Sequence, residues 1–195
     1  MRTVLFGGTF DPVHNAHIEV AREVLRRFAV ERVVFVPAAR PPHKGEGTFA
    51  SFDDRVHMVE LACEGEPRFG VSRIEEEFAR SYSILTIERM LEQGRGPLSF
   101  LIGADAFADI ETWHRWEDVV RLVEFIVVTR PGAVWRLPAG ATVRELSGLW
   151  LPVSSSEIRR ALAEGSRDVA VPAAVLGWIQ DRGLYRSQEL LRNFN

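Results

Sequence analysis

Short apolar segments alternate with amphipathic segments along this chain. The apolar segments are rich in β-branched residues and only four or five residues long, which is typical of buried strands. They lie at 3–6, 32–36, 69–72, 98–102 and 125–129. Between them, apolar positions recur every three to four residues, which predicts helices at 15–28, 52–63, 83–92 and 115–122. The first of these helices has one apolar face, formed by Ile18, Ala21, Leu25 and Phe28.

This alternation of strands and helices predicts the fold class. Strands that are apolar throughout are covered on both faces, and strands separated by helices pair in parallel. The chain is therefore expected to form an α/β fold with a doubly wound parallel sheet. Ligands of such folds bind beyond the carboxyl ends of the strands, near a switch in strand order. The loops that follow the strands should converge there, and they are 7–17, 37–44, 103–105 and 130–132.

The C-terminal part of the chain follows a different pattern. After Trp150-Leu151-Pro152, helices are expected at 155–164 and 173–182, with no strand between them. We therefore divide the chain into a core, residues 1–150, and a small C-terminal helical subdomain, residues 151–195, packed on that core. The segment 131–148 has mixed polarity and is predicted to be a linker.

Composition and charge narrow the classes of protein. The 195 residues are 46% hydrophobic and 26% charged, which suits a globular protein with its own core. The formal net charge is -3, whereas nucleic-acid binders usually carry a basic surplus, so we expect no nucleic-acid partner. Neither a membrane-spanning run nor a signal peptide is visible, so we expect no membrane partner and a cytoplasmic location. The single cysteine, Cys63, lies in a helix-like apolar run and is expected to be a buried thiol, not a nucleophile.

The loop after the first strand carries the clearest chemical signal. Gly7 and Gly8 allow the backbone to approach a ligand closely, and the free N–H groups of the following helix favour an anion. His14 and His17 are three residues apart, so they share a face of the first helical turn. This arrangement predicts a phosphate site, the alternative being a tight strand–helix turn with two incidental histidines. A zinc site would need a third ligand, and no nearby Cys or His has suitable spacing.

Two later segments also have residues suited to phosphate. Prolines 41 and 42 stiffen the loop that presents His43 and Lys44, although a solvated basic loop would look the same. A second segment combines a helix start, Arg159 and three hydroxyls, those of Ser154, Ser155 and Ser156. Because Ser154 and Glu157 have the spacing of a capping box, a purely structural helix start explains this segment equally well.

Taken together, these segments resemble a known family. The stretch GGTFDPVHNAH at 7–17 is similar to the start of the nucleotidyltransferase α/β-phosphodiesterase superfamily, whose HxGH signature falls on 14–17. The GGTFDP part resembles the bacterial nicotinate-nucleotide adenylyltransferases. PPHK at 41–44 and VSSSEIR at 153–159 resemble two further motifs of that group. One departure is Ala16, where the signature usually has glycine.

The resemblance implies a Rossmann-like nucleotidyltransferase fold and a specific reaction. Nicotinate mononucleotide would attack the α-phosphorus of ATP, giving deamido-NAD and pyrophosphate, with Mg²⁺ arriving on ATP. The implied catalytic residues are His14, His17, Lys44 and Arg159. Those implied for ATP binding are Gly7, Gly8, Thr9, Phe10, His14, His17, Gly103, Asp105, Ser154, Ser155, Ser156 and Arg159, where Asp105 would bond a ribose hydroxyl.

A second set of residues is expected to bind the mononucleotide. The turn at 81–83 precedes a helix, so its N–H groups suit a carboxylate. Trp113 can stack on a pyridine ring, although a tryptophan in an amphipathic stretch is equally typical of a core. With the resemblance, the full set is His43, Lys44, Tyr82, Ser83, Trp113 and Arg130. The sequence is compatible with a homo-oligomer but does not specify one.

Other interpretations account for fewer of these features. A class I aminoacyl-tRNA synthetase fragment would need a KMSKS-like loop and far more chain. Phosphopantetheine adenylyltransferase is typically shorter and has threonine in place of His14, while cytidylyltransferases lack PPHK and the Ser-Tyr-Ser turn. A non-catalytic nucleotide sensor would be expected to have lost His17, Lys44 or Arg159, and all three are present. An adenylyltransferase for nicotinamide mononucleotide or another phosphate-bearing acceptor is the remaining alternative.

Overall fold

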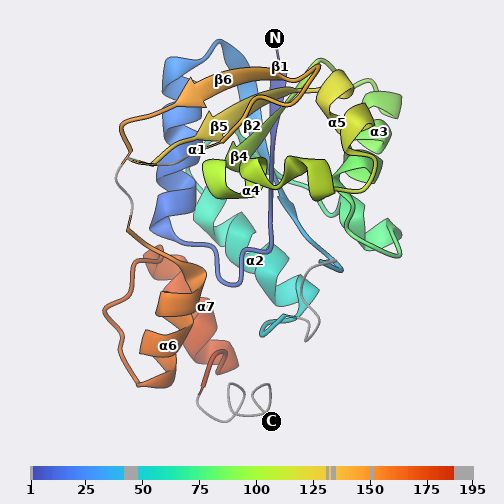
Figure 1. The fold of residues 1–195 in the computed structure, drawn as a ribbon. Coiled ribbons are helices and arrows are strands. Elements are labelled where there is room, and N and C mark those ends of the chain that lie inside the picture. Colours follow the sequence, from blue (N-terminus) through green and yellow to red (C-terminus); the bar gives the residue numbers. More distant parts are fainter. Residues whose placement is uncertain (1, 42–47, 131, 133–134, 150–151, 187–195) are drawn as a thin grey trace.

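One parallel sheet runs through the protein (Figure 1). The computed structural model describes residues 2–41, 48–130, 132, 135–149 and 152–186. Within these residues, six parallel strands lie in the order β3-β2-β1-β4-β5-β6, so the predicted α/β fold is confirmed. The strands are β1 Arg2–Gly8, β2 Val30–Pro37, β3 Phe69–Val71, β4 Leu98–Gly103, β5 Glu124–Val128 and β6 Thr142–Leu146.

The strand order changes direction at β1. Phe6 of β1 pairs with Phe35 of β2 on one side and with Leu101 of β4 on the other. The chain therefore builds outward from β1 to β3 and then returns across β1 to add β4, β5 and β6. Beyond the carboxyl ends of β1 and β4, the following loops separate and leave the crevice in which such folds bind ligands.

Helices cover both faces of the sheet (Figure 1). Val4 and Phe35 belong to the core under α1 and α2, whereas their chain neighbours Leu5 and Val34 belong to the core under α3, α4 and α5. This division follows from the two-residue period of a strand, which sends successive side chains to opposite faces. The helices are α1 Asn15–Arg27, α2 Phe52–Cys63, α3 Ser83–Glu92, α4 Ala104–Ala108, α5 Trp116–Leu122, α6 Ser155–Ala163 and α7 Ala173–Arg182, with 3₁₀ turns η1 Ile74–Glu77 and η2 Ile110–Thr112.

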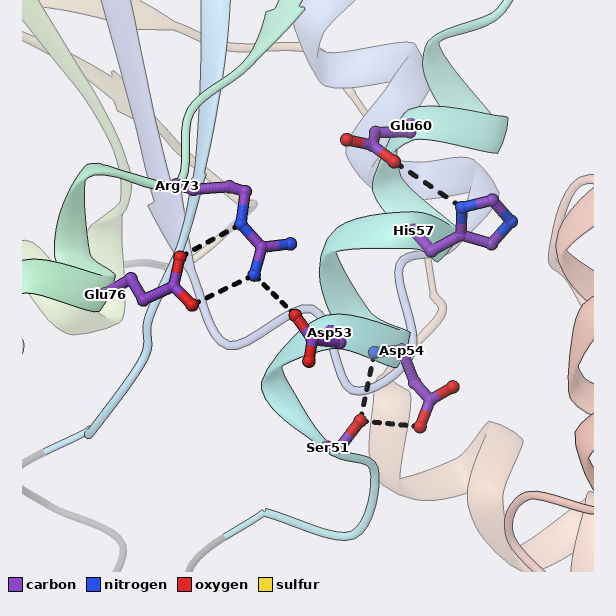
Figure 2. A network of polar contacts seen from close by, with 7 residues as sticks. All are labelled: Ser51, Asp53, Asp54, His57, Glu60, Arg73 and Glu76. Carbon is purple, nitrogen blue, oxygen red and sulfur yellow. Dashed lines mark hydrogen bonds and ion pairs between the residues drawn. The ribbon is translucent and has the colours of Figure 1, made fainter.

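Helix α2 begins at a capping serine, Ser51. The Ser51 hydroxyl accepts a hydrogen bond from the Asp54 N–H at 3.0 Å and so caps one of the free amides of the first turn. Figure 2 shows this cap together with the Ser51–Asp54 side-chain contact. Asp53 and Asp54 also place negative charge at the positive end of the helix dipole.

The segment predicted to be a linker, 131–148, contains strand β6. This strand pairs in parallel with β5, with Val127 opposite Glu145. Only Leu146 of the strand is buried, because β6 lies at the edge of the sheet. Its charged residues are typical of edge strands, which expose one row of polar backbone groups. The apolar pattern of a buried strand is therefore weak in this segment, which explains why the sequence predicted a linker there.

The two C-terminal helices lie together beyond one end of the sheet (Figure 1). Val175 and Ile179 of α7 belong to the same core as α1 and α2. Trp178 donates a hydrogen bond to Asp54 of α2 at 3.3 Å, and the Asn15 N–H donates to the Ala170 carbonyl at 2.9 Å. The C-terminal segment is thus joined directly to the loop that begins α1.

Candidate functional site

A cavity of about 380 Å³ opens at the carboxyl ends of β1, β4 and β5. It therefore lies at the switch in strand order, where the fold places ligands. The loop after β1, the start of α4 and the start of α6 all contribute to its wall. The lining residues are Phe6, His14, Ala16, His17, Val20, Gly103, Ala104, Asp105, Val128, Arg130, Leu149, Val153, Ser154 and Ser155.

The two histidines form a stacked pair in this cavity. Their ring centres are 3.6 Å apart and the rings are tilted by 20°. The His14 backbone N–H donates a hydrogen bond to His17 Nδ1 at 3.2 Å. Because Nδ1 accepts this bond, the neutral His17 ring carries its hydrogen on Nε2, which makes that atom a donor.

Burial favours the neutral form of both imidazoles. It lowers the pKa of His14 from 6.5 to about 4. It also lowers the pKa of His17 well below its ordinary value, and the nearby His14 lowers it further. An anion in the cavity would act in the opposite direction, since negative charge favours the imidazolium. The pair is therefore suited to respond to a bound phosphate by taking up a proton.

Phe10 packs against His17. Its ring is 2% exposed and meets the His17 ring edge-on, with centres 5.0 Å apart. A Cβ atom at Gly8 would lie 2.9 Å from the Phe10 ring, so only glycine fits here without movement. Gly8 and Phe10 thus shape the loop, and neither residue lines the cavity.

Asp11 joins this loop to two distant segments. Its carboxylate accepts hydrogen bonds from the N–H groups of Phe49 at 2.9 Å and Ala50 at 3.1 Å. It also accepts one from the Tyr185 hydroxyl at 2.8 Å. Asp11 is 1% exposed, so these charge-assisted bonds replace the water that the carboxylate has lost.

Two arginines hold backbone carbonyls of the same loop. Arg55 is fully buried and donates to the Thr9 carbonyl at 2.7 Å. Arg159 donates to the Asp11 carbonyl at 2.7 Å and to the Ser156 hydroxyl at 3.2 Å. The predicted cation Arg159 is therefore fixed against the loop that carries the histidines.

The serine segment caps a helix and also lines the cavity. Ser154 caps α6 by accepting from the Glu157 N–H at 3.2 Å, so the structural interpretation is confirmed. Ser154 and Ser155 also line the cavity, and Ser155 donates to the Pro12 carbonyl at 2.9 Å. Ser156 is exposed and does not belong to the cavity wall.

A second cavity, of about 670 Å³, lies on the other side of α4. It brings together three residues predicted for the mononucleotide, namely Tyr82, Ser83 and Trp113. The Tyr82 ring stacks on His114 with centres 4.5 Å apart, and Trp113 meets Phe100 edge-on at 5.9 Å. The full lining is Arg80, Ser81, Tyr82, Ser83, Ala106, Asp109, Thr112, Trp113 and His114.

The remaining predicted residues fall in several places. Arg130 lies in the first cavity with the histidines, apart from Tyr82 and Trp113. Gly103 and Asp105 also line the first cavity. Residues 7–9 form the end of β1 and the adjoining loop and lie outside both walls. The expected His43 and Lys44 lie outside the described residues.

Comparison with known proteins shows the family of this chain. The Cytidylyltransferase-like family model matches residues 5–161. A probable nicotinate-nucleotide adenylyltransferase from Solibacter usitatus is 56% identical over 95% of this chain and 100% of that protein. Another from Geotalea daltonii is 38% identical over 95% of this chain and 98% of that protein. The chain belongs to the nicotinate-nucleotide adenylyltransferase family.

Solved structures that are also named as adenylyltransferases of this kind share the fold of this chain. A Plasmodium falciparum nicotinic acid mononucleotide adenylyltransferase complexed with NaAD matches with a TM-score of 0.74 at 17% identity. That match covers 95% of this chain and 98% of the other. A putative nicotinate-nucleotide adenylyltransferase from Vibrio parahaemolyticus matches with a TM-score of 0.67 at 20% identity, covering 95% and 96% of the two chains. At identities this low, the similarity shows only that the fold is shared.

Ala16, which stands where the signature it resembles usually has glycine, lines the first cavity. Ala16 is in the first turn of α1, where the backbone is helical and glycine is not required. Its side chain is 8% exposed and faces the cavity that holds the histidines. In this member of the nicotinate-nucleotide adenylyltransferase family, the methyl group therefore takes space in the cavity without straining the backbone.

Sequence reasoning missed the buried residues that hold the site together. Asp11 and Arg55 were assigned no role, although a charged residue on the buried face of α2 was a detectable signal.

Cys63 is half-buried, and burial raises the pKa of its thiol to about 12, so it carries little thiolate. Among the described residues, no three His, Cys, Asp or Glu side chains are arranged to hold a metal ion, and no helix is long and apolar enough to cross a membrane.

Proposed function

We propose that this protein transfers the adenylyl group of ATP to nicotinate mononucleotide, forming deamido-NAD and pyrophosphate. The observation that carries the proposal is that α4 forms a wall shared by the two cavities. Ala104 and Asp105 face the first cavity, and Ala106 faces the second. Two substrates on either side of one short helix can meet where the cavities adjoin. Both cavities are formed by a single chain, so a homo-oligomer is not needed for this arrangement.

The first cavity is the proposed ATP site. His14, His17 and the α6 N-terminus would surround the phosphates, because neutral donors and helix amides both favour an anion. Asp105 would bond a ribose hydroxyl, beside Gly103. The loop backbone of Gly7, Gly8, Thr9 and Phe10 is expected to shape this site, together with Ser154, Ser155 and Ser156. ATP would enter with Mg²⁺, which adds positive charge and keeps several water ligands.

The chemical step needs positioning more than covalent help from the protein. An oxygen of the mononucleotide 5′-phosphate attacks the α-phosphorus, and the bond to the β-phosphate breaks as pyrophosphate leaves. The proposed role of His17 is to donate from Nε2 to the α-phosphate as charge builds up there. Lys44 and Arg159 would take up charge on the departing pyrophosphate, with His14 steadying the triphosphate. Catalysis would then come from orientation and preorganised charge.

The second cavity is the proposed mononucleotide site. Trp113 offers an aromatic face for the pyridine ring beside Tyr82, and such stacking adds to the area buried. The first amides of α3, around Ser83, would bind the carboxylate. Arg130, with His43 and Lys44, would bind the 5′-phosphate, since that group has to reach the ATP in the first cavity. The cytoplasm, where ATP is available, is the proposed location.

Substrate preference tests this proposal. Purified protein would be given ATP and Mg²⁺ with either nicotinate or nicotinamide mononucleotide, and the dinucleotide and pyrophosphate would be quantified. We expect kcat/KM to favour the acid by at least about tenfold, the effect of one poorly paired polar group. Equal efficiency with both compounds would contradict the carboxylate site, and no turnover with either would favour the nucleotide sensor.

A further inference from the structure

Glu75 differs from the glutamates beside it. It is 6% exposed, whereas Glu76 and Glu77 are exposed and pair with arginines. Figure 2 shows Arg73 between Glu76 of η1 and Asp53 of α2, so the turn is anchored on its outer side. Glu75 points the other way, into the protein. A buried carboxyl is costly unless it has hydrogen-bond donors.

The groups that act on the Glu75 carboxyl come from other segments of the chain. The Thr86 hydroxyl donates to Glu75 Oε1 at 2.8 Å. The Ser81 side chain, the Ala39 backbone and the Arg55 charge also act on this carboxyl and lower its pKa, whereas its Oε2 atom has no hydrogen-bond partner among the described residues. These groups partly offset burial, which raises the pKa of Glu75. Thr86 lies in the first turn of α3 and Ser81 in the turn before it, while Ala39 follows β2.

The segments that meet at Glu75 are also bonded to each other. The Arg40 N–H donates to the Ser81 hydroxyl oxygen at 2.8 Å, and the Ser81 N–H donates back to the Arg40 carbonyl at 3.0 Å. The Arg40 guanidinium donates to the Phe78 carbonyl at 2.6 Å. The segment after β2 and the turn before α3 are thus bonded to each other, and both lie next to the buried Glu75 carboxyl.

We propose that Glu75 is a positioning residue for the mononucleotide site. It holds Ser81 and Thr86 so that the first amides of α3 face the second cavity at the depth that a pyridine carboxylate needs. Glu75 does not line that cavity itself, whereas Ser81, Tyr82 and Ser83 do. This inference rests on the proposed function, because it assumes that the second cavity binds the mononucleotide.

The proposal predicts an effect on one substrate only. Thr86, Ser81 and Ala39, which act on the Glu75 carboxyl, do not line the first cavity. Loosening them should displace the α3 amides while the histidines keep their places. A general structural defect would instead weaken the binding of both substrates. The ratio of the two KM values therefore separates positioning from simple destabilisation.

The test uses Glu75→Gln with Glu77→Gln as the matched control. Glutamine keeps one carbonyl oxygen, which can still accept from Thr86, but it removes the carboxylate charge that Ser81, Ala39 and Arg55 favour. We expect KM for nicotinate mononucleotide to rise roughly tenfold and the acid-over-amide preference to fall, on the scale of one charge-assisted hydrogen bond. KM for ATP should stay within about twofold, as should both constants of the control.

Thr86→Val provides a second measurement that does not depend on the folding of Glu75→Gln. It removes only the hydroxyl that donates to Glu75, and the same one-sided rise in KM is expected. Unchanged KM values, or equal rises for both substrates, would overturn the role of Glu75. Wild-type protein is assayed first, since its failure to use nicotinate mononucleotide would reject the proposed function instead.

Discussion

Acidification is expected to destabilise this protein through His14. The pKa of His14 is about 4 in the folded protein, compared with 6.5 for an unperturbed histidine, and burial is the main cause. Between these values the unfolded chain binds a proton that the folded protein does not. The stability contributed by neutral His14 is therefore complete above pH 6.5 and is lost as the pH falls toward 4.

The size of the effect follows from the two pKa values. The gap between about 4 and 6.5 corresponds to about 3 kcal/mol in total. The linkage relation assigns about 2 kcal/mol of this to the interval between pH 7 and pH 5. His14 is 5% exposed, so solvent screening reduces this figure little. His17 acts in the same direction, because burial lowers its pKa as well.

Urea unfolding at pH 7, 6 and 5 measures this loss, with the fluorescence of the five tryptophans as the signal. The wild type is compared with His14→Gln, which removes the titrating ring but retains a polar side chain. The variant should lose about 2 kcal/mol less than the wild type over the interval. His57→Gln is the control, since that imidazole lies on α2 with 40% of its side chain exposed. It should follow the wild type.

An equal loss in the wild type and His14→Gln would refute the reasoning. It would mean that the His14 ring takes up its proton in the folded protein as easily as in the unfolded chain. A smaller loss in His57→Gln than in the wild type would show that part of the pH dependence originates on α2. The first result would remove the argument that the histidine pair is neutral before a phosphate binds.

Two further variants test the groups around the histidines. His17→Ala should lower turnover by at least about 10², the scale of removing one preorganised donor, with the urea midpoint at pH 7 close to that of the wild type. Near-normal turnover would exclude His17 from the chemistry. Tyr185→Phe removes the hydroxyl that donates to Asp11, and should lower the free energy of unfolding by about 1.5–3 kcal/mol, the range for a bond to a charged group. A loss below roughly 0.5 kcal/mol would show that this contact does not hold the C-terminal segment.

The strands that the sequence predicted are those whose burial is encoded locally. Residues 33–36 are apolar throughout, and residues 98–102 are apolar except for Ser99, because both faces of a central strand are covered; they lie within β2 and β4. Strand β6 lacks this pattern because its neighbour on one side is solvent. Its position depends on pairing with β5, which a local pattern does not reveal.

The candidate site divides in the same way. The candidate residues in the glycine-rich and serine-rich loops could be predicted because neighbouring residues in the sequence already show their chemistry. Asp11 and Glu75 were missed because their donors come from other parts of the chain. The Tyr185 hydroxyl that donates to Asp11 is 174 positions away, and Thr86 is 11 positions from Glu75. Spacing within one segment carries no information on such pairs.

By itself, the sequence determined the alternation of strands and helices, the glycine turn with its two histidines, and the family. The tertiary structure decided the properties that depend on burial and on distant contacts. It stacked His14 on His17 in a low-dielectric pocket, which keeps both rings neutral, and it placed α4 between the two cavities. Residue types are local, whereas solvation and distance arise only when the chain has folded.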